Sequence, residues 1–361
     1  MRGFGEELLN SNANSSALGG LAVQSPRNPA YPINAVNSNV TVGALMLGSY
    51  GSDGKNNRLV GNGRPDFFRA QVPLPVGFHV GLGFSEWYNQ DFAVYSESTS
   101  AYRRFVAGAG GIYDLNASLS RSFGRNAAIG LEYSGLIGSS SELWRFDAYQ
   151  GNYVTYDSVN YDYHGDALRL GIMCRLPFLR FDRSSDSSVE LGGFYEQVLD
   201  FGLDDWTRTH GTTSESIGRA VKFPARYGLG LTAFPAPDWK VCLEGIHQSA
   251  SQITIGGSTP AAFTDALRVT LGAEYRLKEK YPLRFGLHWQ NWYLKAADGT
   301  QVREIGLSAG STAAIPGFGA LDYSLEYANR NGGSLKENVL RAQLSLYFEE
   351  PWKKRTRNWG Y

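Results

Sequence analysis

Hydrophobic and polar residues alternate one by one along most of this chain from about residue 40 onwards. Residues 266–277 read ALRVTLGAEYRL, so that Leu267, Val269 and Leu271 are separated by single polar or small residues. Because neighbouring side chains of a β-strand point to opposite faces, this pattern predicts strands with one apolar and one polar face. The alternation recurs with no helical repeat between the segments, which indicates an all-β protein.

The pattern predicts fourteen strands, an even number, as single-chain bacterial barrels require. They cover residues 40–49, 66–73, 77–89, 105–122, 126–142, 158–176, 188–200, 216–234, 239–250, 264–277, 282–294, 302–315, 320–329 and 337–348. Short connections rich in proline or charge alternate with longer, polar connections rich in tyrosine. Short turns at one rim and long loops at the other are typical of a transmembrane barrel in the outer membrane.

The polar faces of these strands carry acidic and basic residues in similar numbers. An arginine facing lipid at mid-membrane costs about 2–4 kcal/mol, so the charged faces have to line the lumen. A lumenal charge network is therefore predicted, and it includes Arg226, Arg268, Glu274, Arg276 and Arg284. The balance of signs favours ion pairs that brace a narrow interior over a pore selective for one charge.

Two further expectations concern the direction of particular side chains. Uninterrupted alternation through residues 216–234 places Val221 and Phe223 against lipid and Lys222 in the lumen. Aromatic residues near strand ends, including Trp87 and Tyr88, are expected at the membrane–water boundary, where amphipathic rings are enriched. Strand propensity alone also enriches aromatic residues, which is the alternative explanation.

Composition narrows the function classes. The formal net charge is zero, which gives no electrostatic case for a nucleic-acid partner. No apolar stretch reaches the roughly 18 residues that a membrane helix needs. Residues 1–20 contain no signal-peptide core, so we expect a processed or trimmed chain. Cys174 and Cys242 lie on different predicted strands with opposite facing, and no disulfide is expected between them.

The residues that could carry chemistry make a weak case for an enzyme. Residues 306–310, GLSAG, match the serine hydrolase pattern, which needs a strand-to-helix elbow and a later histidine. Here the segment lies within a predicted strand, and the last histidine is His288. Asp162, His164 and Asp166 share one strand face and could hold a metal ion, but a solvated outer rim explains them better. We therefore predict no catalytic residue, no metal and no cofactor.

Both ends of the chain depart from the alternating pattern. Residues 1–38 are rich in asparagine, serine and glycine and are predicted to form a plug or a loose arm, with the barrel over 39–348. Residues 349–361 form a basic tail containing Lys353, Lys354, Arg355 and Arg357. Such a run could dock an acidic periplasmic partner, although a run of like charge is more often simply solvated.

The N-terminal motifs carry a family resemblance. Gly3-Phe4-Gly5, Ala17-Leu18-Gly19-Gly20 and Asn28-Pro29-Ala30 follow one another in the order seen in the hatch of FadL-type outer-membrane transport proteins, which the chain resembles. The resemblance implies a fourteen-stranded barrel, passive uptake of hydrophobic molecules and lateral release at a kinked early strand. Asn28, Pro29 and Ala30 would then belong to the hatch. Gly81 and Gly83 would permit the kink, although close strand packing also explains glycine there.

Two other functions remain open at this point. Some relatives, the PorV-like barrels, serve as subunits of secretion or assembly machines, and an accessory or docking barrel is the second hypothesis. A porin for small polar solutes is the third. The expected partners are outer-membrane lipid and a hydrophobic small molecule, with other envelope proteins under the second hypothesis. The expected location is the bacterial outer membrane.

Overall fold

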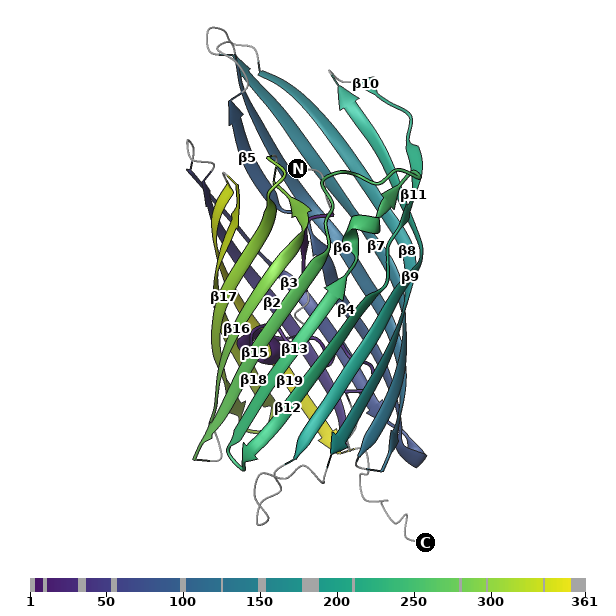
Figure 1. The fold of residues 1–361 in the computed structure, drawn as a ribbon, viewed down its shortest axis with the longest axis vertical. Coiled ribbons are helices and arrows are strands. Elements are labelled where there is room, and N and C mark those ends of the chain that lie inside the picture. Colours follow the sequence, from purple (N-terminus) through teal and green to yellow (C-terminus); the bar gives the residue numbers. More distant parts are fainter. Residues whose placement is uncertain are drawn as a thin grey trace.

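The fold is known from a computed structural model, which describes residues 4–8, 12–31, 37–52, 57–97, 102–124, 126–148, 154–176, 188–209, 212–278, 281–296, 298–333 and 335–351. Within these residues the chain forms one closed antiparallel sheet (Figure 1). The last strand pairs with the first long strand, from Lys336↔Ser52 to Pro351↔Asn37, and this pairing closes the barrel. Among the described residues, no helix is both long and apolar enough to cross a membrane.

Fourteen long strands make the barrel wall. They are β2 (Asn37–Ser52), β3 (Asn57–Pro73), β4 (Phe78–Asn89), β6 (Tyr102–Phe123), β7 (Ala127–Ala148), β8 (Val154–Leu176), β9 (Val189–Thr209), β12 (Arg226–Ala236), β13 (Trp239–Gln248), β15 (Ala266–Leu277), β16 (Tyr281–Lys295), β17 (Gln301–Ile315), β18 (Gly319–Gly332) and β19 (Leu335–Pro351). Each predicted strand has a counterpart, and most are longer than predicted. The ladders of β6 to β9 extend well beyond the other strands (Figure 1).

Short elements complete the fold. They are β1 (Glu6–Glu7), α1 (Ala13–Ala17), η1 (Pro75–Gly77), β5 (Phe92–Glu97), β10 (Thr212–Thr213), β11 (Ile217–Lys222), η2 (Ala250–Gln252) and β14 (Thr254–Ile255). The helix α1 lies inside the barrel, in purple in Figure 1. The strand β1 pairs with the end of β4, so that Glu6 lies opposite Asn89 and Glu7 opposite Tyr88.

The two faces of the wall differ as the alternation predicts. Large aliphatic side chains cover the outside, and Met46, Leu82, Leu229 and Leu307 are each at least 59% exposed. Polar and charged side chains on the same strands are buried in the lumen. An apolar outer surface around a charged interior is the arrangement of a transmembrane barrel, because only lipid makes that surface favourable. The predicted fold class is thereby confirmed.

One predicted strand, residues 216–234, is interrupted. It consists of β11 and β12, separated by Phe223, Pro224 and Ala225. The alternation changes phase at this break, so Val221 and Phe223 are buried and Lys222 is exposed, contrary to the prediction. Proline has no N–H to donate to a ladder, and here its position marks the break that an uninterrupted alternation conceals.

The aromatic residues expected at the membrane–water boundary do not all face outward. Tyr323 and Tyr327 face outward and are about half exposed. Trp87 and Tyr88 are instead buried in the lumen, where they are 2% and 1% exposed. A register shift between Glu86 and Tyr88 breaks the β4–β6 ladder, and strand β1 pairs with β4 there. Because of this bulge, two consecutive side chains can both be buried.

Candidate functional site: the plugged lumen and its aromatic cluster

The N-terminal segment, defined here as residues 4–8 and 12–31, lies inside the barrel and is bonded to its wall (Figure 1). Asn12 caps helix α1, and its Oδ1 accepts a hydrogen bond from the backbone N–H of Ser15 at 2.9 Å. This cap satisfies one of the free N–H groups of the first turn. A second, that of Ala13, donates to Ser345 Oγ on β19 at 2.9 Å. The wall therefore fixes where the helix begins.

The serine of the GLSAG motif holds the next turn of this segment. Ser308 Oγ accepts from the backbone N–H of Gly19 at 3.0 Å and donates to the carbonyl of Ala17 at 3.0 Å. The glycines of the motif make room for inward-facing neighbours, since a Cβ at Gly306 would lie 2.2 Å from the His288 ring. The motif therefore packs and binds the N-terminal segment.

Inward-facing glycines on six strands leave the space that the segment fills. They are Gly130, Gly171, Gly230, Gly272, Gly286 and Gly310, each with an atom of the N-terminal segment close to the position of a Cβ. At Gly286 a Cβ would lie 2.0 Å from the backbone nitrogen of Gly19. Only glycine allows this approach, because a side chain at this position would clash with the N-terminal segment unless the backbone moved. This set of glycines encircles the segment.

Glu244 on β13 provides the most concentrated contact between wall and segment. Its Oε2 accepts hydrogen bonds from the backbone N–H groups of Ala22 at 2.8 Å and Val23 at 3.0 Å, and its Oε1 accepts from Gln24 at 2.5 Å. The side chain is fully enclosed at 3% exposure. Three consecutive N–H groups pointing at one carboxylate form a backbone nest, which favours negative charge.

The predicted hatch residues Asn28, Pro29 and Ala30 lie in this lumen. Asn28 Nδ2 lies 3.3 Å from the carbonyl oxygen of Gly193 in the wall, and its Oδ1 accepts from the N–H of Ala30 at 3.0 Å. Gly130 leaves room for Pro29. Asn28 and Ala30 are both 0% exposed. The three residues thus form a bonded turn against β7, β8 and β9.

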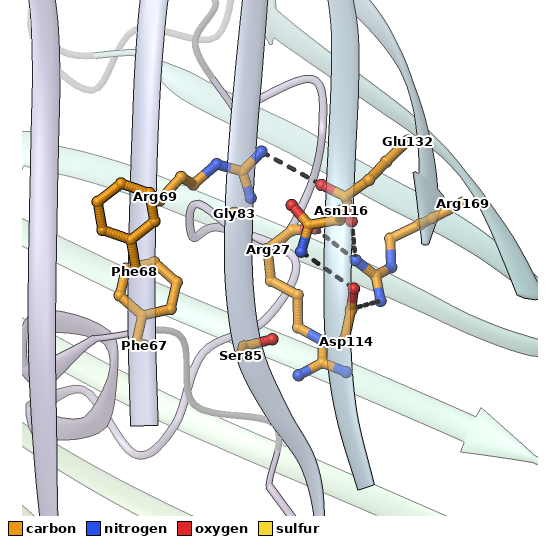
Figure 2. A pocket seen from close by; sticks show the side chains of 10 residues that line it. All are labelled: Arg27, Phe67, Phe68, Arg69, Gly83, Ser85, Asp114, Asn116, Glu132 and Arg169. Carbon is orange, nitrogen blue, oxygen red and sulfur yellow. Dashed lines mark hydrogen bonds and ion pairs between the residues drawn. The ribbon is translucent and has the colours of Figure 1, made fainter. Parts of the chain in front are cut away.

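Ion pairs close the lumen beside that turn. Figure 2 shows Arg169 bound to Glu132, which also accepts from Arg69 at 3.3 Å. Arg169 Nε donates to Glu196 at 2.8 Å, and its Nη1 donates to the backbone carbonyl of Arg27 at 3.3 Å. The cavity among these side chains measures about 10 Å³, which is at the lower limit for one water molecule. Among the described residues, these side chains therefore leave space for at most about one water molecule at this site.

Two of the predicted network arginines bind the N-terminal segment directly. Arg226 forms ion pairs with Glu7 of the segment and with Glu196 of β9, the latter at 3.1 Å, and it is 1% exposed. Arg268 donates to the carbonyl of Gly19 at 2.7 Å. Their role is therefore more specific than bracing the wall, since each joins the wall to the segment.

The other three predicted members lie together nearer one rim. Arg284 pairs with Glu274 at 2.8 Å and with Asp322 at 3.3 Å, and all three side chains are largely buried. Arg276 pairs with Glu274 at 3.3 Å, but its side chain is 57% exposed at the end of β15. It lies at the edge of the network, where an ion pair contributes little.

Glu6 of the segment meets a second pair of arginines. It forms ion pairs with Arg341 of β19 and, at 3.3 Å, with Arg330 of β18. Burial alone would raise the pKa of Glu6, but the two guanidinium groups outweigh it and hold the pKa below its usual range. Glu6 is therefore ionised and bound at neutral pH.

An aromatic cluster fills the lumen around Phe4. Its members are Phe4, Trp87, Tyr88, Ile112, Leu136, Tyr163, Ala167, Val198, Phe201, Leu203, Val221, Phe223, Ala250, Ile253, Phe263, Tyr293 and Leu294. The Phe4 ring lies 4.9 Å from that of Phe223 and 6.1 Å from those of Tyr88, Phe201 and Phe263, measured between centroids. The lumen thus contains a packed apolar cluster that the strand alternation does not reveal.

The wall beside this cluster has an interruption in its strand pairing. Strand β3 pairs with β2 along its length but with β4 only from Phe67↔Ser85 to Pro73↔His79. Among the described residues, no backbone ladder joins residues 57–66 of β3 to β4 or β5. We call this the β3–β4 interruption. It begins where Asp66 is bulged out of the β2–β3 ladder, next to Pro65, which cannot donate.

The irregularity in β4 does not lie at Gly81 and Gly83, where a kink was predicted. Both glycines are in regular register with β3 and β6, and the shift comes between Glu86 and Tyr88. A Cβ at Gly81 would lie 2.5 Å from Ser118 Oγ, and one at Gly83 would lie 2.5 Å from Asn116 Oδ1. Close packing of neighbouring side chains, the alternative reading, accounts for both positions.

One buried group of side chains has a composition compatible with a metal. The ligand atoms of His288, Glu304 and Glu326 lie within 4.8 Å of one another. Arg330 pairs with Glu304 at 2.8 Å, and Arg341 pairs with Glu326. These guanidinium groups already neutralise the carboxylates and would repel a cation, so the group fits an ion-pair network better than a metal centre.

The remaining predicted residues fall elsewhere. Asp162 and His164 are exposed on the outer face of β8, as expected. Cys174 and Cys242 are both free. Residues 353–357 of the basic tail lie outside the described part of the chain. The sequence alone does not reveal the contacts of Phe4 in the aromatic cluster or the nest at Glu244, because both depend on which distant residues the closed barrel brings together.

The sequence matches no family model and no curated protein. Solved structures do match it over nearly its whole length. The monoaromatic hydrocarbon channel CymD is 14% identical, with a TM-score of 0.64, and the match covers 96% of this chain and 99% of that one. A FadL homologue of Pseudomonas aeruginosa is 14% identical, with a TM-score of 0.62 and coverage of 95% and 99%. The toluene transporter TodX of Pseudomonas putida is 12% identical, with a TM-score of 0.62 and coverage of 98% and 100%.

The fold and its apolar outer surface define the class of the protein, an integral outer-membrane β-barrel. Its particular fold is that of the FadL-type hydrocarbon channels. The resemblance found in the N-terminal motifs is confirmed at the level of the fold.

Proposed function

We propose that this protein is a passive outer-membrane channel for hydrophobic small molecules, with the N-terminal segment as its hatch. The observation that carries the proposal is the aromatic cluster around Phe4, which lies above a lumen filled by residues 12–31. A lumen of charged ion pairs has no need of such a cluster for solubility or stability of the wall. An apolar ligand entering from outside would find in this cluster the largest group of buried apolar side chains among the described residues.

The size of the ligand follows from what it would replace. Phe4 contributes one benzene ring to the cluster and belongs to residues 4–8 of the N-terminal segment. A molecule of similar size and polarity could take its place and leave the other rings in contact. The structures of similar fold include channels for monoaromatic hydrocarbons and for toluene, which supports an apolar ligand of this size.

The direction of release follows from the plug. Residues 12–31 are held by the Glu244 nest, by Ser308 and by the encircling glycines, so passage straight down the lumen would break many buried hydrogen bonds at once. We infer that residues 12–31 stay in place and that the gating part of the hatch is residues 4–8. The ligand would then leave sideways into the membrane at the β3–β4 interruption, where no ladder has to be broken.

Ligand binding tests this function directly. Trp87 is buried in the cluster with its ring centroid 4.8 Å from that of Tyr88, so an apolar ligand should change its fluorescence. We expect toluene to give a saturable change in the detergent-solubilised protein, and Phe4→Ala to tighten it because no side chain has to be displaced. Phe318→Ala, at an outward-facing turn, is the matched control and should leave binding unchanged.

Transport is measured separately, as the entry of labelled toluene and of labelled glucose into cells expressing the protein. Uptake of toluene but not of glucose is the expected result. Absence of saturable toluene binding together with fast glucose entry would contradict the proposal and favour a polar-solute porin.

A further inference from the structure

The β3–β4 interruption is bridged by one arginine. Arg64 lies on the part of β3 that has no ladder partner in β4 or β5 among the described residues. Its Nε donates to Glu86 Oε2 at 2.6 Å, and its Nη1 donates to Asp91. Glu86 belongs to the bulged end of β4, and Asp91 lies between β4 and β5. One guanidinium group thus joins the two sides where backbone pairing has stopped.

The bridge is built rather than incidental. The side chains of Arg64, Glu86 and Asp91 are 14%, 1% and 12% exposed, so all three are largely withdrawn from solvent. Asp91 is itself oriented by the backbone, because its Oδ1 accepts from the N–H of Gly110 at 3.1 Å. Asn62, also on β3, donates to the same carboxylate. Arg64 donates a hydrogen bond to each of the two carboxylates, and such charge-assisted hydrogen bonds are stronger than hydrogen bonds between neutral groups.

The bridge adjoins the aromatic cluster, on strands that also carry outward-facing side chains. Glu86 is followed directly by Trp87 and Tyr88, which belong to the cluster, whereas Leu59 and Met46 on β3 and β2 are outward and strongly exposed. An apolar molecule that leaves the cluster through the β3–β4 interruption would meet the Arg64 side chain, which spans it. Charged groups oppose that passage in the closed state, because an apolar ligand cannot replace their hydrogen bonds.

We infer that Arg64, Glu86 and Asp91 form an ionic latch that controls lateral passage through the wall. The inference rests on the proposed function, since it concerns the release of the same ligand. Arg64 is a positioning residue here: it holds the two edges together and does not bind the ligand. Lateral release requires its guanidinium group to swing away from at least one carboxylate.

The first test removes the latch and measures entry of toluene into cells. Arg64→Gln should raise the initial rate about tenfold, which corresponds to about 1.4 kcal/mol in the free energy of opening. Arg64→Lys should give a smaller increase, because an ammonium group cannot bind two carboxylates in the same bidentate manner. The matched control is Arg175→Gln, which removes an ion pair with Glu190 across a continuous ladder and should leave the rate unchanged.

The second test closes the interruption covalently. Asn62→Cys and Asp91→Cys are combined in a Cys174→Ser background, so that no exposed native thiol competes. Without cross-linker, entry in this variant should be faster than in the wild type, since the Asp91 carboxylate of the latch is missing. A cleavable bifunctional thiol reagent should then stop entry, and a reductant should restore it. Ser141→Cys with Asn160→Cys joins paired residues of β7 and β8 and should have no effect when cross-linked.

The outcomes separate this inference from the function on which it rests. Faster entry in Arg64→Gln together with reversible arrest by the cross-link supports the latch. Unchanged entry in both variants, while toluene still binds and enters the wild type, overturns the latch and leaves the channel proposal intact. Failure of the wild type to bind or admit toluene overturns the channel proposal and the latch with it. Heat-modified mobility in detergent shows for each variant that the barrel is folded.

Discussion

Replacement of Glu244 by glutamine should loosen the plug without unfolding the barrel. In the wild type one carboxylate accepts three backbone N–H groups, at 2.8, 3.0 and 2.5 Å. A glutamine side chain keeps one oxygen and presents an NH2 group where the other oxygen was. At least one buried N–H of residues 22–24 is then left facing another donor.

The size of the effect follows from those contacts. A hydrogen bond to a charged group contributes about 1.5–3 kcal/mol, and a buried donor left without a partner costs about 1–3 kcal/mol. One bond lost and one donor stranded give roughly 3–5 kcal/mol in favour of the displaced plug. Relief from burying the charge reduces this figure, so we take roughly 3 kcal/mol. Since about 1.4 kcal/mol is tenfold, the displaced population should rise by roughly a hundredfold.

Planar-bilayer conductance is the appropriate assay, because a displaced plug opens an aqueous path. The wild type should be closed almost all the time, and Glu244→Gln should show frequent openings. Glu190→Gln provides the control, since it makes the same chemical change at the rim, in a pair with Arg175. Equal conductance in the wild type, Glu244→Gln and the control, with Glu244→Gln still folded by heat-modified mobility, would refute the assignment of the nest as the principal anchor.

Three further outcomes are expected. Gly286→Val should displace the segment and raise conductance, whereas Gly245→Ala, with no atom within 4 Å of the added carbon, should behave as wild type. Ser308→Ala should lower the thermal stability of the closed state by about 1–3 kcal/mol, and an esterase assay should give the same background rate for wild type and variant. The depressed pKa of Glu6 contributes stability that is present above its ordinary pKa of 4.5 and is lost as pH falls below it, so protease access to the N-terminus should increase on acidification and should become less pH-dependent in Glu6→Gln.

The alternation predicted the inward and outward faces of most wall strands, because lipid requires apolar side chains on the outer face of every strand. Where that rule alone operates, as in Leu267 to Tyr275, the predicted faces are correct. It failed at Val221 and Phe223, and at Trp87, because a bulge or a proline shifts the phase by one residue, so that the side chains before and after it follow opposite alternations. The same irregularities build the aromatic cluster, so the functional part of the lumen is where strand periodicity is least informative.

The candidate site was predicted only to the extent that local motifs contain it. The motifs around Phe4 and Asn28 placed a plug at the N-terminus, and balanced charge indicated ion pairs in the lumen. Neither could assign partners, since Glu244 and Arg64 each bind residues that the chain brings close only when the barrel is closed. A charged residue on a polar strand face has the same appearance in sequence whether it braces the wall, holds the plug or spans an interruption.

The encircling glycines also constrain how the molecule is made. These glycines lie on strands from β7 to β17 and contact the N-terminal segment. The same segment precedes β2 in the chain, and β2 closes the barrel by pairing with β19. If the barrel closed first, the polar N-terminal segment would have to enter through one open end, past lumenal side chains that are already paired with one another. The N-terminal segment must therefore be in place inside the curving sheet before β19 pairs with β2, so that this closing pairing encloses it.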